Sequence, residues 1–455
     1  MRIVSKFGGG TLKNEGDLER TARIIGDKVR KGDELVVVLS AVAGVTDSLI
    51  EVSSKALEDE KHIPIFTGEL RLKHERLLEG VKNEGLKLGA MRKIDSKLNV
   101  LKRILYGVCY LKELSPRAKD WINSFGERLS VIVMEAHLKD RGIKCNAFDA
   151  DEVGMITSSD FGDAIPLMGE IETRLNQTVT PMLKETVIVI TGYFGVDKKG
   201  NVTTFGRGGS DFSASIIASA IGADFLEIWK DVPGFMSADP KVVKGAKLIK
   251  KLGYEEAEEL GYFGTKILHP RTVIPIRDKK MKIVIKSVFE PDVDGTVISE
   301  EEEKTESVLK AVAVKRDMAM ITVRSSEIAE YPGMAAKLFS IMNLHGINVD
   351  AIATSEIGIS FTIRENDLEK AKHALVSSDL RIERLLYEDD VSLVGVVGSG
   401  ILNTPNITGK LFSALGERGI NIEFVTSGAS DNISFVVKRT EVNKVIESIH
   451  EKFLR

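Results

Sequence analysis

The chain has 455 residues, of which 43% are hydrophobic and 29% are charged, and its formal net charge is −4. This length is too great for one hydrophobic core and predicts two or three domains. The near balance of 63 basic and 67 acidic residues excludes the strong charge typical of proteins that bind nucleic acid or a membrane surface. The cysteines, Cys109 and Cys145, are too few for a disulfide framework or a typical zinc site. With no signal-peptide pattern and no apolar run near roughly 20 residues, we expect a cytoplasmic protein with no membrane contact.

The first part of the chain alternates between strand and helix patterns. The stretch "MRIVSKF" predicts a short strand, and residues 18–29 have apolar positions at helical spacing. The runs "ELVVVLSA", "ETVIVITGYFG" and "MKIVIKSV" are continuously apolar, as expected for strands buried on both faces of a parallel sheet. We therefore predict an α/β domain over residues 1–297, with a mostly parallel sheet and helices on both faces. Residues 51–120 are expected to form a charged helical excursion.

The last third of the chain contains an internal repeat. The acidic segment within residues 298–307 predicts a linker. Beyond it, "AAKLFSIMNLHGINVDAI" is matched by "GKLFSALGERGINIEFV", 73 residues further on. Each copy has the ferredoxin-like order of an α+β domain. We expect one domain at 308–388 and another at 389–455, with the spare strand 308–316 crossing over to complete the second domain.

A cation and a glycine run follow the first predicted strand. Glycines at 8, 9 and 10 let the backbone approach a ligand, so that amide groups meet an anion. Lys6 would add a positive charge beside them, which suits a nucleotide phosphate. A tight turn after a strand explains the glycines alone equally well.

The segment "TTFGRGGSD" places Arg207, a glycine pair, Ser210 and Asp211 together. A guanidinium can hold a carboxylate through two parallel hydrogen bonds. A helix N-cap after a glycine turn would explain Ser210, but it would not explain Arg207 and Asp211 together.

Two further segments carry candidate polar groups. Glu127 follows a glycine in "NSFGERLS", where an acid is also favoured simply by the positive end of a helix. Ser40 and Thr46 follow a buried strand in "LSAVAGVTDSL". Such hydroxyls bind ligand carboxylates, and they are also ordinary helix caps.

In order and spacing, "KFGG", "LSAVAGVTDSL", "SFGERLS", "TTFGRGGSD", "DVPGF…DP" and "FGTKILHPRT" resemble the motifs of aspartate kinases, in the amino acid kinase superfamily. The repeat resembles that family's paired ACT domains. The resemblance covers essentially the whole chain. It implies ATP-dependent phosphorylation of the L-aspartate side chain to 4-phospho-L-aspartate, the first step of lysine, threonine and methionine biosynthesis, with ATP and Mg²⁺.

The resemblance also implies residue roles. Lys6 would neutralise the transferred phosphoryl group, and Asp211 would orient the reactants. Arg207 would hold the α-carboxylate of aspartate, and Glu127 would hold its ammonium group. The rest of the substrate site would be formed by Ser40, Thr46, Phe194 and Ser210. The nucleotide would contact Gly8, Gly9, Lys230, Asp231, Met236, Lys241 and Lys266.

The nucleotide side departs from the family pattern. Lys230 replaces Thr, Met236 replaces an aromatic Tyr, and Lys241 replaces Arg. Losing Tyr removes a flat surface for adenine, although Met is soft enough to pack there, and Lys lacks the bidentate grip of Arg on a phosphate. His269, in "LHPRT", is interpreted as structural.

The regulatory half is similar to lysine-sensitive aspartate kinases in the stretch "VDAIATSE". The resemblance implies a lysine effector site formed by Tyr331, Gly333, Met334, Ala335, Asp350, Ser355, Glu356 and Ile357. Two carboxylates suit a cationic effector. In the alternative, Asp350 caps a strand end and Glu356 is merely solvated. We expect a homodimer or larger homo-oligomer through the ACT domains.

Two other functions stay open at this point. The phosphoryl acceptor could be another small acid. Against this stands a set of residues suited to recognise the zwitterion of an amino acid, namely Arg207, Glu127, Ser40 and Thr46. The protein could instead be an amino-acid sensor with a decayed kinase domain. The altered nucleotide positions favour that alternative, and the intact Lys6, Arg207 and Asp211 oppose it.

Overall fold

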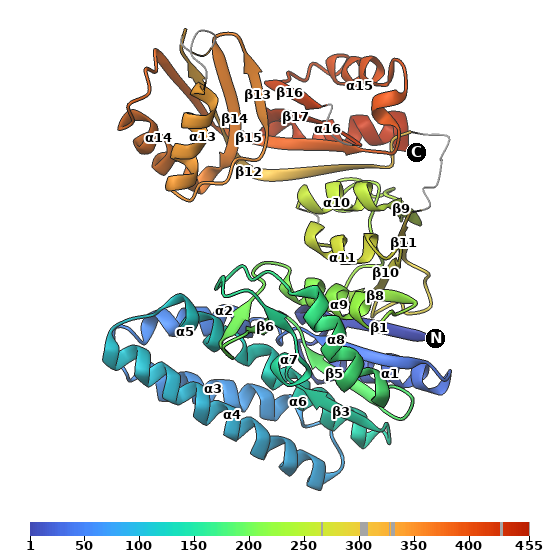
Figure 1. Ribbon diagram of the computed structural model, residues 1–455. Coiled ribbons are helices and arrows are strands. Elements are labelled where there is room, and N and C mark those ends of the chain that lie inside the picture. The colour runs from blue at the N-terminus through green and yellow to red at the C-terminus, as the bar shows by residue number, and fades with distance from the viewer. Residues whose placement is uncertain (265–266, 301–307, 327, 329–332, 428–430, 455) are drawn as a thin grey trace. The chain divides into compact units, whose positions relative to one another are not determined.

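The computed structural model describes residues 1–264, 267–300, 308–326, 328, 333–427 and 431–454. They form two compact units (Figure 1). The first consists of Met1–Phe235, Lys250–Tyr254 and Ile267–Glu301, and the second of Met236–Ile249, Glu255–Lys266 and Glu302–Arg455. The chain thus passes between the units more than once, and the domain boundaries expected from the sequence stay predictions.

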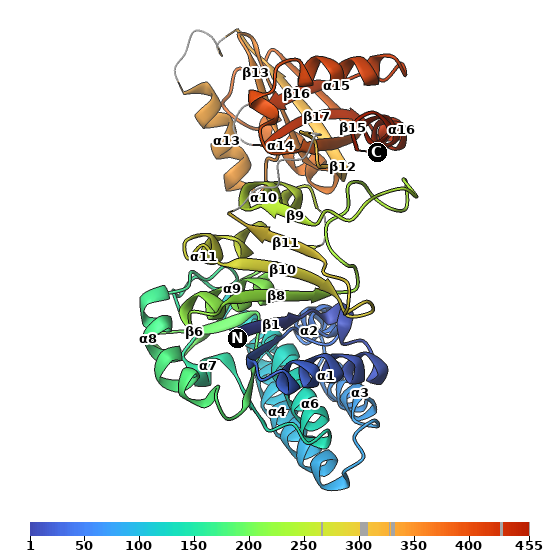
Figure 2. The same cartoon turned by 90° about the vertical axis from the view of Figure 1, so that its right-hand side faces the viewer.

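The first unit is built on a large twisted sheet in the order β3-β5-β2-β1-β8-β10-β11-β9 (Figure 2). All neighbouring pairs are parallel except β10 with β11. The prediction of a mostly parallel sheet is confirmed. The strands are β1 (Arg2–Phe7), β2 (Glu34–Leu39), β3 (Cys145–Phe148), β5 (Val187–Thr191), β8 (Phe225–Lys230), β9 (Lys251–Gly253), β10 (Lys282–Ser287) and β11 (Thr296–Ser299).

Helices cover both faces of this sheet. In β1, alternate residues Ile3 and Phe7 join the hydrophobic core shared with α1 (Glu15–Arg30) and α6 (Phe125–Asp140). Lys6 points to the other face, where it meets α9 (Gly209–Ala220). The remaining elements of this unit include α7 (Ala150–Val153), α8 (Met168–Thr178), α11 (Ile274–Arg277) and a small sheet of β4 (Ile156–Thr157), β6 (Phe194–Asp197) and β7 (Val202–Thr204).

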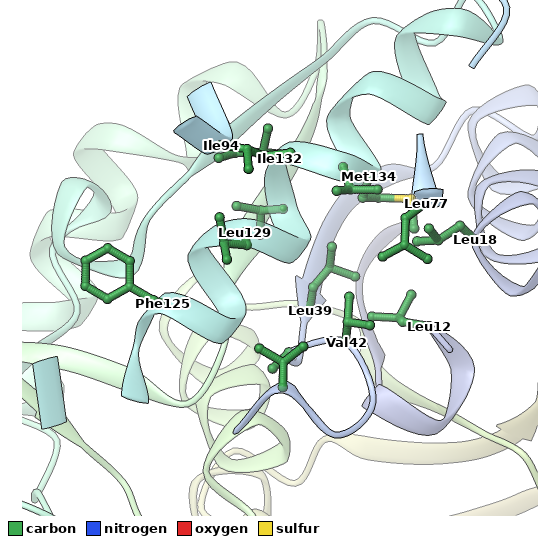
Figure 3. Packing of buried hydrophobic residues seen from close by; sticks show 14 of the residues in the cluster. Leu12, Leu18, Leu39, Val42, Leu77, Ile94, Phe125, Leu129, Ile132 and Met134 are labelled. Atoms are coloured by element: carbon green, nitrogen blue, oxygen red, sulfur yellow. The ribbon is translucent and has the colours of Figure 1, made fainter. Parts of the chain in front are cut away.

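The charged helical excursion is present and shares its core with the sheet. It comprises α2 (Val45–Lys55), α3 (His62–Leu77), α4 (Glu84–Leu111) and α5 (Pro116–Asn123). Figure 3 shows Leu39 at the end of β2 packed in one cluster with Leu77 of α3, Ile94 of α4 and Leu129 of α6. Each fully buried leucine of this kind contributes about 1.5–3 kcal/mol to stability. The loop that follows β2 is therefore anchored on a rigid base.

The second unit holds an antiparallel sheet in the order β13-β14-β12-β15-β17-β16. Its strands are β12 (Ala311–Arg324), β13 (Ile352–Ser355), β14 (Gly358–Arg364), β15 (Arg384–Val397), β16 (Phe424–Ser427) and β17 (Asn432–Lys438). Residues 311–315 of β12 pair with 393–397 of β15, and residues 318–324 pair with β14. Each half of the sheet therefore has four strands in ferredoxin-like order, as the fold class predicted.

The helices of the second unit pack in pairs on the two halves of its sheet. Residues of α13 and α14 share a core with β12 and β14, and residues of α15 and α16 share one with β15 and β17. One more helix of this unit, α10, lies between β9 and β10 in the chain. The helices are α10 (Tyr254–Tyr262), α13 (Met334–Leu344), α14 (Leu368–Val376), α15 (Ile407–Gly416) and α16 (Val442–Ile449).

Two composition-based expectations concern membranes and thiols. Among the helices in the described part of the chain, none has both the length and the apolar character that a membrane span requires. Cys109 and Cys145 are free thiols, and both are buried. Because both thiols are buried, neither is a reactive group on the protein surface.

Candidate active site

Three charged side chains meet where β1 and β8 end. These strands are parallel neighbours, so the topology brings Lys6 and Lys230 to the same edge of the sheet. Asp211, in the first turn of α9, lies between them. Its Oδ1 forms an ion pair with Lys6 Nζ, and its Oδ2 accepts a hydrogen bond from Lys230 Nζ at 2.9 Å. The sequence predicts that Lys6 and Asp211 act together and that Lys230 contacts the nucleotide, and the structure places Lys230 on Asp211 as well.

Burial decides the charge of this cluster. It lowers the pKa of Lys6 to about 8, although Asp211 favours the ammonium form. Burial also pushes the pKa of Asp211 upward, but Lys230 and Lys6 hold it well below its usual range. One carboxylate thus faces two cations near neutral pH. The excess positive charge suits an incoming anion such as a phosphoryl group.

The glycine run lies directly beside this cluster. Residues 9–11 form a single 3₁₀ turn in which the Thr11 amide donates to the Gly8 carbonyl at 2.9 Å. A Cβ at Gly9 would lie 2.8 Å from the Ala41 carbonyl oxygen, so no larger residue fits there. A Cβ at Gly8 would lie 3.4 Å from Lys6 Nζ. The run is therefore a tight turn, and it also borders the Lys6 ammonium group.

Glu127 presents a buried carboxyl with one free oxygen. It lies in the first turn of α6 and is 3% exposed. Its Oε1 accepts a hydrogen bond from the Ala41 amide at 3.0 Å, and the Ser210 hydroxyl lies 3.5 Å from the same oxygen. Its Oε2 has no partner among the described residues. Burial raises the pKa of Glu127 to about 8. Such a group gains most from a ligand that brings a positive charge.

Arg207 lies on the exposed tip of the turn before α9, between Gly206 and Gly208, which have φ of +70° and +74°. It forms no ion pair with any residue in the described ranges, so its guanidinium is available to an anion. Ser40 and Thr46 are half-buried after β2. These positions agree with the roles implied by the resemblance, which remain predictions.

Phe194 differs from the other predicted substrate residues, because its side chain is fully buried. The guanidinium carbon of Arg128 lies 4.5 Å from its ring centroid. Arg128 is itself held by ion pairs with Asp149 and Asp151. The ring of Phe194 is therefore part of the packed interior, and its backbone amide donates to the Gly192 carbonyl at 3.0 Å, so its predicted substrate contact stays a prediction.

Sequence reasoning missed three features of this region: the Ala41 amide, the Arg128 side chain and the backbone of Tyr193. The Ala41 amide that holds Glu127 is a backbone group, which carries no residue signature. Arg128 stands next to Glu127 in "SFGERLS", and that adjacency is the signal that could have found it. Tyr193 has a positive φ of 76°, unusual for a residue other than glycine, and nothing in the pattern indicates it.

The other residues predicted to contact the nucleotide belong to both units of the chain. Asp231 is exposed, and its Oδ2 would be 3.7 Å from a Cβ at Gly10. Met236 is half-buried and Lys241 is exposed, and both belong to the second unit. Lys266 lies outside the described residues. These four assignments stay predictions.

In the second unit, Asp350 is the best-defined residue of the predicted effector set. Its Oδ1 accepts hydrogen bonds from Lys315 Nζ at 2.5 Å and from the Tyr262 hydroxyl at 2.9 Å. Glu356 is exposed, as the solvation alternative expects. Tyr331 lies outside the described residues. Among the rest, Met334 is buried, and the exposed members are Gly333, Ala335, Ser355 and Ile357.

Comparisons with known proteins agree with this architecture. Residues 1–287 match the amino acid kinase family, and residues 321–378 and 394–453 match the ACT domain. The chain is 32% identical to the chloroplastic aspartokinase 2 of Arabidopsis thaliana over 100% of this chain and 84% of that protein.

Two solved structures of Escherichia coli aspartokinase III are similar over the full chain. The complex with aspartate and ADP (R-state) has a TM-score of 0.85 at 27% identity, covering 100% of both chains. The complex with lysine and aspartate (T-state) has a TM-score of 0.85 at 28% identity, covering 100% of this chain and 99% of that one. The resemblance inferred from the motifs is confirmed: the chain belongs to the aspartokinase family, with an amino acid kinase domain followed by ACT domains.

Proposed function

We propose that this protein transfers the γ-phosphoryl group of ATP to the side-chain carboxylate of L-aspartate, giving 4-phospho-L-aspartate. This is the first step toward lysine, threonine and methionine. The observation that carries the proposal is the cluster of Lys6, Asp211 and Lys230 in the same unit as the buried carboxyl of Glu127. The aspartate and ADP bound to E. coli aspartokinase III support the same pair of ligands.

The charges of the cluster fit this chemistry. Phosphoryl transfer needs in-line placement and stabilisation of charge more than covalent help. The attacking aspartate oxygen is already anionic, so the reaction requires no strong general base. The Lys6 ammonium would stabilise the charge on the moving phosphoryl group. Asp211 would hold Lys6 and Lys230 in place, because its carboxylate binds both.

Substrate recognition requires opposite charges at two ends of one small molecule. Arg207 would pair with the α-carboxylate, which matches the fork of a guanidinium. Glu127 would accept a hydrogen bond from the ammonium group through its unpartnered Oε2. Ser40, Thr46 and Ser210 are the hydroxyls available for the remaining contacts. The set distinguishes an amino acid from a simple dicarboxylic acid.

Magnesium would enter chiefly with the nucleotide. No group of three or more metal-ligating side chains occurs in the described part of the chain. This fits Mg²⁺, which is commonly held by phosphates, water and one or two carboxylates. Asp231, exposed beside the glycine turn, is a carboxylate that could contribute. The ion would neutralise phosphate charge.

We also propose that lysine inhibits the enzyme by binding near Asp350, with ACT domains pairing in a homodimer or larger homo-oligomer. The lysine complex of E. coli aspartokinase III supports this effector. The ammonium group of lysine would compete with Lys315 Nζ for the Asp350 carboxylate. Inhibition then requires that lysine binds one state of the protein more tightly than another.

An acyl-phosphate assay tests the proposed reaction. Purified protein with ATP, Mg²⁺ and L-aspartate should release ADP and give a hydroxamate when hydroxylamine traps the product. A panel of small acids, including glutamate and succinate, should give little or no product. Folded protein that binds ATP but shows no aspartate-dependent turnover would remove the proposal and favour the amino-acid sensor.

A further inference from the structure

The turn that carries Arg207 is held from one side by a buried acid. Asp120, in α5, is 2% exposed. Its Oδ2 accepts hydrogen bonds from the Thr204 and Gly162 amides, each at 2.8 Å, and its Oδ1 accepts one from the Thr204 hydroxyl at 2.9 Å. One carboxylate thus ties the end of β7, three residues before Arg207, to the loop around Gly162.

Arg271, from the segment "LHPRT", holds the same turn from another side. Its guanidinium donates to Asp163 Oδ1 at 2.5 Å and to the Phe205 carbonyl at 3.1 Å. The guanidinium carbon also lies 4.8 Å from the ring centroid of Phe212. Phe205 precedes Arg207 and Phe212 follows it, so one side chain contacts both arms of the turn.

The turn also packs closely against His269. At Gly208 a Cβ would lie 2.5 Å from the Cβ of His269, two residues before Arg271. Asp120 accepts from the Gly162 amide and Arg271 donates to Asp163, so the two supports contact adjacent residues of the same loop. Asp120 and Arg271 are therefore parts of one clamp around the turn.

We propose that Arg271, Asp163 and Asp120 are positioning residues that fix Arg207 for the α-carboxylate of the amino acid substrate. The proposal rests on the proposed function, because it assigns that substrate to Arg207. As positioning residues, these three would act on Arg207 and would not themselves contact the substrate. Their effect is on orientation, and it should appear as a change in affinity for aspartate rather than for ATP.

The variants Asp163→Asn and Arg271→Lys separate orientation from charge. Asp163→Asn removes a negative charge near Arg207, so electrostatics alone would tighten the binding of anionic aspartate. Arg271→Lys keeps the charge but loses the planar fork that contacts Asp163 and Phe205 together. Loss of orientation predicts weaker aspartate binding in both variants. The Asp163 side chain is 78% exposed, so its change should not unfold the protein.

The experiment measures KM for aspartate, KM for ATP, kcat and melting temperature for the full-length protein. Glu170→Gln is the matched control, because Glu170 forms a partly exposed ion pair with Lys198 elsewhere in the same unit. We expect Asp163→Asn and Arg271→Lys each to raise KM for aspartate about three- to tenfold, with KM for ATP and kcat within about twofold of wild type. The control should change none of these.

Three results would overturn the proposal. They are an unchanged KM for aspartate in both variants, a lower KM for aspartate in Asp163→Asn, or a general loss of function in which kcat and melting temperature fall while KM rises for both aspartate and ATP. Aspartate affinity is also measured by calorimetry. A wild-type protein that binds aspartate without phosphorylating it would refute the proposed reaction, and the affinities of the variants would then decide the positioning roles alone.

Discussion

Glu127 allows a sharp test of substrate recognition. Its carboxyl is 3% exposed, and this burial raises its pKa to about 8. Near neutral pH, most of the free protein therefore holds Glu127 in its protonated form. In the proposed site, the ammonium group of aspartate pairs with the carboxylate form of Glu127, so binding at neutral pH should release a proton.

The pKa sets the size of the effect. With a pKa of about 8, roughly 0.9 proton should leave per aspartate bound at pH 7, and about 0.5 at pH 8. The observed affinity should rise about fivefold between these two pH values, because the fraction of Glu127 that is ionised rises. The aspartate ammonium group stays protonated over this range, so it does not contribute.

Isothermal titration calorimetry measures this proton release directly. Aspartate is titrated at pH 7 in two buffers with different ionisation enthalpies, in the presence of Mg²⁺ and a non-hydrolysable ATP analogue. The phosphates of the analogue would favour the ammonium form of Lys6, so the titration of Lys6 should contribute little to the measurement. Glu127→Gln should bind aspartate about 2–4 kcal/mol more weakly and release no proton. A binding heat that does not depend on the buffer in wild type, or proton release that persists in the variant, would refute the reasoning.

Three further predictions concern other charged side chains. Lys6→Met should lower kcat about 10²–10³-fold in the hydroxamate assay while aspartate binding by calorimetry persists, because the lost ammonium acts mainly in the transition state. Asp350→Asn should raise the lysine concentration for half-inhibition at least about tenfold, and Lys315→Met should lower it, since Lys315 competes for that carboxylate. Lys310→Met should destabilise the second unit by about 3–5 kcal/mol in urea unfolding, because it leaves Glu256 buried without the cation that lies 2.7 Å away. Unchanged inhibition curves, or an unchanged unfolding midpoint, would contradict the latter two.

The layered sheet could be predicted because its strands are nearly continuous apolar runs. Such runs occur where helices cover both faces, as for β2 and β5, whereas residues 283–287 of β10 alternate between buried and half-buried positions. The ferredoxin-like order of the second unit could be predicted because the two copies of the repeat have the same succession of strands and helices. The place of α10 could not be predicted, because it lies between two strands of the first unit in the chain and yet belongs to the second. The local hydrophobic pattern predicts which face of a helix is apolar, but it does not predict which sheet that face packs against.

The candidate site shows the same division. Lys6, Arg207 and Asp211 stood out because a charge beside glycines is unusual in a structural turn. The contact of Lys230 with Asp211 depends on β8 lying next to β1, although the two strands are more than 200 residues apart in the chain. The clamp made by Asp120 and Arg271 was invisible for the same reason. These contacts depend on which elements far apart in the chain pack together. The spacing of residues along the sequence does not predict that packing.

The chain path around α10 bears on how an effector could influence catalysis. Tyr262, the last residue of α10, donates its hydroxyl to Asp350, and Glu256 of the same helix is bound by Lys310 at 2.7 Å. Nine residues after Tyr262 the chain reaches Arg271, which contacts the Arg207 turn. A ligand that took the Asp350 carboxylate would therefore act on a helix that the chain connects to this support. Such continuity transmits a signal only if the two states of the segment differ in free energy, and lysine must bind one of them more tightly. Arg271→Lys should then change the lysine sensitivity as well as KM for aspartate, whereas Glu170→Gln should change neither.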